Sequence, residues 1–139
     1  MNRPQDWQFD YASENDMYVT EFSTEELENY LNKPYPKDKI CLYCVLFHKD
    51  TEKKVTVFGA NNQFVVECWI NKNAVFQRKD TDTSKKATIY NYPNTGESLE
   101  VLEGEVMDFE NVKKIVTYFY KQMKPHPDYS VVKKSYIYK

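Results

Sequence analysis

The stretch ICLYCVLFHKDTEKKVTVFGANNQFVVECWI (residues 40–70) decides the fold of this chain. It contains three apolar runs of strand length, separated by two polar turns. The first run, 40–48, is apolar on both alternating faces, which indicates a strand at the centre of a sheet. Gly, Ala and Asn at 59–62 suit a turn that needs positive φ. The stretch therefore predicts a meander of strands at 40–48, 54–59 and 63–70.

Strand and helix signals continue on both sides of this meander. Ser23 and Glu26 form a capping box that predicts a helix as far as Asn32. A second helix is predicted to begin at Asp108 and to end before Pro125. Its apolar stripe consists of Val112, Ile115, Val116, Phe119 and Met123. Further strands are expected at 17–22, 74–79, 87–92, 98–106 and 130–139. This order predicts an α+β fold, an antiparallel sheet of about six to seven strands with two helices packed on one face.

The length and composition indicate one domain. A chain of 139 residues can bury a single core, so residues 1–139 are expected to form one domain, with 1–15 as a loosely held N-terminal arm. Trp7, Phe9 and Tyr11 alternate within that arm, so one face of it could dock onto the body, and a short edge strand is possible there. No apolar run is long enough to span a bilayer, and the start lacks a signal-peptide pattern. With three cysteines in no framework spacing, these features favour a cytoplasmic location.

Charge is distributed unevenly along the chain. Residues 1–32 hold eight acidic residues against one basic residue, a formal charge of −7, which leaves +5 for residues 33–139. Two interpretations remain open: the acids are solvated or cap helices, or they form an acidic surface for a basic partner. The net charge of −2 gives no global field that would draw the protein to nucleic acid or membrane.

Residues capable of chemistry are few and poorly grouped. Cys41 and Cys44 have CxxC spacing but fall inside a predicted strand, which favours small core residues over a redox or zinc site. His48 and His126 have no nucleophile nearby in the sequence. Glu100, Glu103 and Glu105 are expected at a solvent-facing or edge position of a strand. Lysines mixed with tyrosines, as in Tyr118, Tyr120 and Lys121, leave stacking on single-stranded nucleic acid as a minor alternative. We therefore predict no catalytic residues, no metal site and no cofactor.

From Phe58 onward the sequence resembles the small immunity proteins of bacterial polymorphic-toxin and contact-dependent inhibition systems. The resemblance lies in FGANNQFVVECW (58–69), the strand with Gly104, the helix MDFENVKKIVTYFYKQMK (107–124) and a closing strand, although Tyr136 stands where such a protein has a Trp. It implies an antitoxin that is not an enzyme and that blocks the active face of a cognate protein toxin domain, with a nucleic-acid-targeting toxin as the expected partner. From the charge and the lack of a long apolar run we expect no direct nucleic-acid partner and no membrane partner, and we expect the antitoxin to be a monomer or weak homodimer.

An acidic inhibitor surface would speed encounter with a basic toxin face. Asp10, Glu14 and Asp16 are candidates for steering, and Trp7 and Tyr11 are candidates for anchors at the partner interface. The alternative from another class is a small ligand-binding or enzymatic α+β domain with a pocket between the sheet and the helices.

Overall fold

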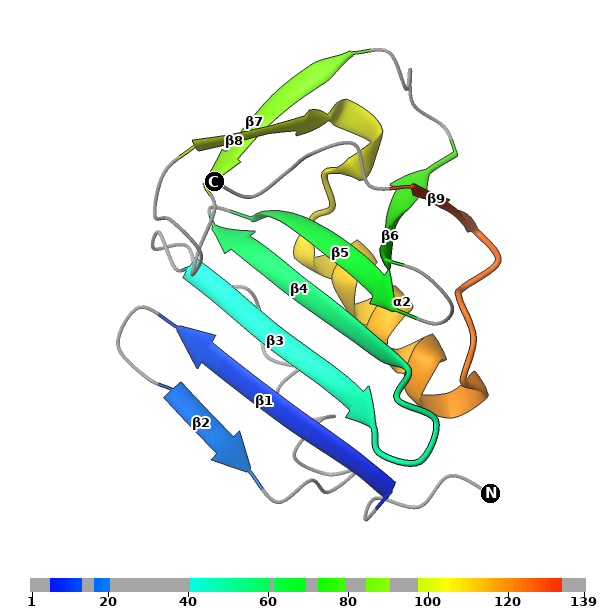
Figure 1. Cartoon of the computed structure of the whole chain (residues 1–139). Coiled ribbons are helices and arrows are strands. Elements are labelled where there is room, and N and C mark those ends of the chain that lie inside the picture. Colours follow the sequence, from blue (N-terminus) through cyan, green and yellow to red (C-terminus); the bar gives the residue numbers. More distant parts are fainter. Residues whose placement is uncertain are drawn as a thin grey trace.

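A computed structural model of the chain describes residues 6–13, 17–20, 41–60, 62–69, 73–79, 85–90 and 98–133. This part contains a seven-stranded antiparallel sheet, a separate two-stranded sheet and the α-helix α2 (Figure 1). The large sheet has the order β2-β1-β3-β4-β5-β6-β9, and β7 pairs with β8. The strands are β1 (Trp7–Ser13), β2 (Met17–Thr20), β3 (Cys41–His48), β4 (Lys54–Ala60), β5 (Gln63–Trp69), β6 (Asn73–Arg78), β7 (Lys86–Tyr90), β8 (Ser98–Leu102) and β9 (Tyr129–Lys133), and the helices are η2 (Glu103–Glu105) and α2 (Phe109–Gln122).

The meander predicted from residues 40–70 is confirmed as β3, β4 and β5. These strands pair in sequence, with Tyr43 opposite Phe58 and Phe58 opposite Val65. Gly59 has a φ of 143°, and a Cβ at this position would collide with the carbonyl oxygen of Gln63. Asn62 follows with a φ of 58°. Positive φ at both positions explains why the hairpin needs Gly and Asn there.

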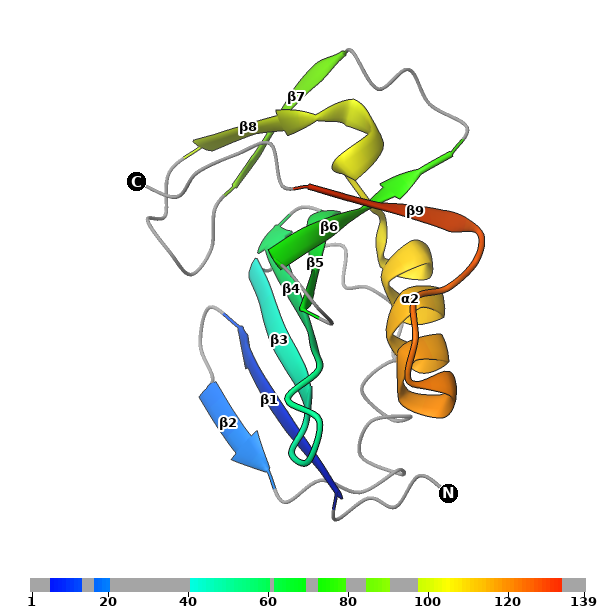
Figure 2. The same cartoon turned by 45° about the vertical axis from the view of Figure 1, so that its right-hand side comes forward.

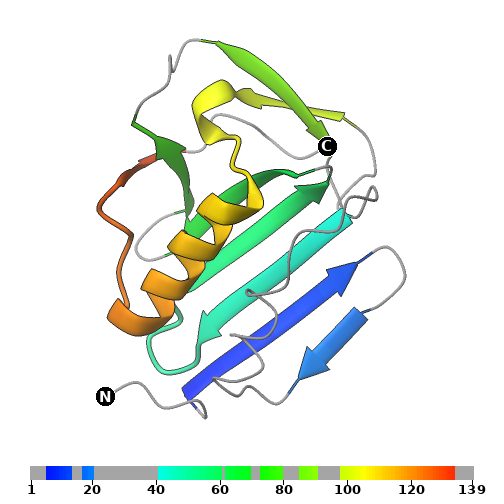
Figure 3. The same ribbon diagram turned by 180° about the vertical axis from the view of Figure 1, so that it is seen from behind.

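The central strands are buried on both faces because a separate core lies on each side. Val57 of β4 and Phe64 of β5 belong to the larger core, which α2 covers (Figure 3). Phe58 and Val65, their neighbours in sequence, belong to a second core on the opposite face. The residues that β7 and β8 contribute to this second core are Ile89, Leu99 and Val101. Alternation along a strand therefore supplies two cores at once, which explains the continuous apolar runs.

Helix α2 begins and ends where the sequence predicts. Asp108 is its N-cap, and the carboxylate accepts a hydrogen bond from the backbone N–H of Asn111 at 2.9 Å. Met123 takes the left-handed conformation at the C-cap, with its N–H bonded to the carbonyl oxygen of Phe119 at 2.8 Å. The start is tied to the sheet because Phe109 N–H donates to the side chain of Asn62 at 2.8 Å. The predicted apolar stripe is confirmed, with Phe109 and Tyr120 also buried.

The α+β class with an antiparallel sheet is confirmed, but the prediction that all the strands form one sheet is wrong. Strands β7 and β8 form their own sheet, which crosses one end of the large sheet instead of extending it (Figure 2). The strand predicted at 98–106 stops at Leu102, where η2 begins. Glu105 then turns inward, and its Oε1 accepts a hydrogen bond from Leu102 N–H at 2.6 Å. The other predicted helix, from Ser23 to Asn32, lies outside the described residues.

Most of the segment expected to be a loosely held N-terminal arm is instead a strand of the large sheet. Residues 7–13 form β1, which pairs along its length with β3 and, over Phe9–Ala12, with β2. Strand β1 is therefore an interior strand of the sheet. Phe9 is fully buried and Leu46 of β3, its cross-strand partner, is 1% exposed, which explains why this segment stays on the body of the protein.

Candidate functional site

The tryptophan expected at a partner interface lies inside the protein. Trp7 is 1% exposed, and its ring packs edge-on against Phe119 at a centroid distance of 5.5 Å and tilted against Tyr120 at 5.2 Å. Alternation along β1 places Trp7 and Phe9 together in the core under α2. The indole Nε1 is buried and has no hydrogen-bond partner among the described residues. Trp7 thus holds β1 against the helix, and its side chain is not available as a surface anchor.

The other nominated residues belong to the β1–β2 side of the sheet. Asp10 pairs with Val45 on one side and Val19 on the other, and Tyr11 pairs with Cys44 and Tyr18. Their side chains are outside the part that the structure describes. Glu14 and Asp16 also lie outside the described residues, in the three-residue link between β1 and β2. The structure therefore brings the backbone of Asp10 and both ends of this acidic link to one side of the sheet.

The cysteines and His48 lie in strands, where Cys68 and His48 are buried. Cys41 and Cys44 lie within β3, which is the strand setting that argues against a redox motif. Burial raises the pKa of the Cys68 thiol from 9.0 to about 11, which removes the thiolate needed for nucleophilic chemistry at neutral pH. His48 is 8% exposed; its Nδ1 lies 2.9 Å from the Thr51 hydroxyl. Within the described segments, no group of three or more His, Cys, Asp or Glu residues could hold a metal ion.

The glutamates expected at a strand surface separate into two environments. Glu100 is exposed and lies 3.3 Å from Lys86 on the paired strand, as a solvent-facing position requires. Glu105 is fully buried, so its expected surface position is wrong. Because η2 replaces the strand after Leu102, Glu103 and Glu105 do not share a strand face. The Glu105 carboxylate accepts the hydrogen bond from Leu102 N–H and so stabilises the turn between β8 and α2.

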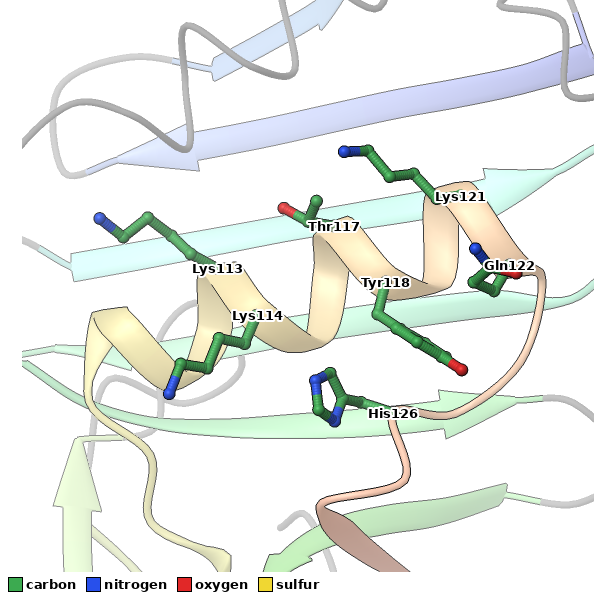
Figure 4. A pocket seen from close by; sticks show the side chains of 7 residues that line it. All are labelled: Lys113, Lys114, Thr117, Tyr118, Lys121, Gln122 and His126. Atoms are coloured by element: carbon green, nitrogen blue, oxygen red, sulfur yellow. The ribbon is translucent and has the colours of Figure 1, made fainter.

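A basic recess lies on the outer side of α2, away from the sheet (Figure 4). Its volume is about 400 Å³, and we call it the α2 recess. The side chains that line it form two rows at four-residue spacing, completed by one residue from the turn after the helix. The lining residues are Lys113, Thr117 and Lys121 in one row, Lys114, Tyr118 and Gln122 in the other, and His126.

The turn after α2 brings an imidazole to the helix. The left-handed backbone at Met123 reverses the chain, so His126 lies beside Tyr118 with 4.8 Å between the ring centroids (Figure 4). His126 Nδ1 accepts a hydrogen bond from Asp128 N–H at 3.0 Å, and its ring also contacts Tyr129 at 5.3 Å. A neutral His126 with this bond carries its proton on Nε2. The recess therefore combines amines, an amide, hydroxyls and a ring pair.

The segment that lines the α2 recess is rich in lysine. From Asn111 to Pro127 the sequence has four lysines and neither Asp nor Glu. Lys113 is partly neutralised, because its Nζ lies 2.9 Å from Glu110. Lys114 and Lys121 are exposed on the two rows. Sequence reasoning grouped Tyr118 with Lys121 and considered His126 only as a possible catalytic residue; it did not name Lys114. The acid-free run from 111 to 127 is the signal that could have grouped these residues.

Comparisons with known proteins leave the family open. No family model matches the chain, and no curated protein matches its sequence. The part of the chain that the structure describes contains no helix with the length and hydropathy of a membrane span.

Proposed function

We propose that this protein is an immunity protein, an antitoxin that binds a cognate bacterial toxin domain and blocks its active face. The observation that carries the proposal is the location of the acidic N-terminal segment. Strand β2 is at one end of the strand order, and β1 lies next to it. Asp10 lies in β1, and Glu14 and Asp16 lie in the link that joins β1 to β2. An acidic segment held at the margin of a rigid sheet suits electrostatic steering of a basic partner.

The surroundings of the reactive groups support binding as the function. Cys68 is held as a neutral thiol by burial, and His48 and Trp7 are packed against each other with ring centroids 4.8 Å apart. The core on each face of β4 and β5 makes the body stiff, which lowers the entropic cost of presenting a fixed surface. Many toxins that act on nucleic acid are basic at the active face, and an acidic margin is complementary to such a face.

Copurification with a toxin domain tests the proposal directly. The full chain is coexpressed with the C-terminal domain of any large secreted protein whose gene directly adjoins its own. The expected result is that the two proteins copurify and that cells survive expression of the toxin domain only with this protein present. Cell death despite abundant folded protein would contradict the antitoxin function.

Charge reversal then tests the proposed surface. Changing Asp10, Glu14 and Asp16 to Lys should slow association at least tenfold at low salt and flatten its salt dependence. The matched control reverses three exposed acids elsewhere, Asp50, Glu52 and Asp128, with the same change in net charge. Equal association rates for the two triple variants, measured by stopped-flow mixing, would exclude the β1–β2 segment as the steering surface.

A further inference from the structure

We propose that one end of the sheet face opposite α2 binds a basic protein surface, with Trp69 as the anchor. We call this end the Trp69 patch and define it by Val45, Phe47, Lys54 and Trp69. The proposal deepens the antitoxin function proposed above and rests on it for the identity of the partner. It gives the role of interface tryptophan, which the burial of Trp7 leaves open, to the other tryptophan of the chain.

The strand register places the patch on the same face as the second core. Trp69 lies four residues after Val65, a member of that core, so alternation along β5 directs both side chains to one face. Lys54 is the cross-strand partner of Trp69, and Phe47 is the cross-strand partner of Lys54. Val45 lies two residues before Phe47 on β3 and shares its face. Figure 1 shows this face, with β7 and β8 toward one end; among the described helices and strands, none lies in front of the end where β5 stops.

The patch gathers apolar side chains that solvent reaches. Trp69 is 39% exposed, and Val45 and Phe47 are half-buried. Val131, which is 40% exposed, shows the contrast, because it pairs with Phe76 of the larger core and so lies on the other face of the sheet. Single exposed apolar residues are common on proteins, whereas a group of them that includes a tryptophan is typical of a binding surface.

The indole of Trp69 already accepts a cation from within the chain. Lys54 Nζ lies 4.8 Å from the centroid of the Trp69 ring. Arginine has a planar guanidinium that stacks on aromatic rings and is more weakly hydrated than an ammonium group, so it suits such a surface better than lysine does. Arginines are therefore the partner side chains that this patch fits.

The acidic segment proposed for steering begins beside the patch. Asp10 of β1 is the cross-strand partner of Val45, and the link that holds Glu14 and Asp16 follows β1. A basic protein attracted by these acids therefore arrives next to the patch. Single-stranded nucleic acid could also stack on Trp69, but the same acids would repel its phosphates. Charge complementarity thus favours a basic protein as the occupant.

A ¹⁹F NMR titration tests the chemistry of the patch without any toxin. The full chain labelled with 5-fluorotryptophan has one signal from each of its two tryptophans, and Trp69→Phe assigns them. Octa-arginine should shift the Trp69 signal saturably and leave the signal of buried Trp7 in place, and high salt should reverse the shift. An oligothymidylate of about ten nucleotides is the comparison probe. An unmoved Trp69 signal with octa-arginine, or a larger shift with the oligothymidylate, would overturn the proposal.

The affinity for the toxin domain tests the surface itself. Trp69→Ala should weaken binding at least about thirtyfold, the loss expected for an anchor residue. The matched control, Tyr118→Ala, removes a half-buried ring from the outer side of α2 and should bind within about twofold of wild type. Thermal melts establish that both variants are folded.

The outcomes separate the patch from the antitoxin function. Equal weakening in the two variants, or weakening in Tyr118→Ala alone, overturns the patch while the wild-type complex upholds the antitoxin function. Failure of the wild-type chain to bind the toxin domain, with the octa-arginine response retained, removes the antitoxin function and supports the patch as a site for a different arginine-rich protein.

Discussion

Truncation of Trp7 should destabilise the fold strongly, because the structure makes this residue part of the core. Trp7 packs against Phe119, Tyr120 and His48. Replacing a buried aromatic residue with Ala costs about 3–5 kcal/mol of unfolding free energy. Removing the buried indole N–H, which lacks a partner among the described residues, returns about 1 kcal/mol. The expected loss for Trp7→Ala is therefore about 2–4 kcal/mol.

Urea unfolding followed by far-UV circular dichroism measures this loss. With a typical urea dependence for a small domain, the midpoint should fall by about 2 M. Trp69→Ala is the matched control, since Trp69 is 39% exposed and its ring contacts Lys54 at 4.8 Å. That control should cost about 1 kcal/mol or less. A loss below about 1 kcal/mol for Trp7→Ala would refute the core assignment and restore Trp7 as a candidate surface anchor.

Fluorescence gives an independent check on the same residue. The protein has two tryptophans, so Trp69→Phe leaves Trp7 as the only one. Its emission should then be shifted to shorter wavelength and protected from quenching by iodide, because the ring is shielded from water. Emission typical of a solvated indole would contradict the burial seen here.

Three other substitutions test separate parts of the fold. Gly59→Ala should lower the unfolding free energy by about 2 kcal/mol or more, since φ is 143° and the new Cβ would meet the Gln63 carbonyl; a thermal melt unchanged from wild type would contradict this. Asp108→Ala removes the N-cap of α2 and should cost about 1 kcal/mol, whereas Asp108→Ser, which also caps, should cost much less. The pKa of Cys68 is raised on folding, so the unfolded thiol ionises first and the native state loses stability as pH rises from 9.0 toward about 11. Urea unfolding at a series of pH values should show a larger loss between pH 9 and 11 in wild type than in Cys68→Ala, and the difference is the contribution of the thiol.

Local signals in the sequence predicted the elements whose ends are set by neighbouring residues. The cap at Asp108 and the φ at Gly59 depend on atoms a few residues away, so both could be read from the sequence. The separation of β7 and β8 into their own sheet depends on contacts between distant segments, such as Ile89 and Phe58 in one core. Alternation shows that a strand has an apolar face, but it does not show which surface that face meets.

The same limit applies to the candidate sites. Trp7 has the residue type of an interface anchor, and only the pairing of β1 with β3 shows that it lies under α2. Lys114 and His126 line the same recess because the chain reverses at Met123, a non-glycine residue in the left-handed conformation. Sequence reasoning has no strong signal for such a reversal, since Gly and Asn are the usual residues there.

The two cores that share β4 and β5 impose a constraint on how this chain can vary. Val57 and Phe58 are adjacent in sequence but belong to different cores. A change of side-chain volume at Val57 therefore alters packing on one face of the sheet, and a change at Phe58 alters packing on the other. Backbone adjustments that relieve crowding on one side disturb the fit on the other. Substitutions are therefore best tolerated on the outward surfaces of β7, β8 and α2, where a side chain can change without altering either core.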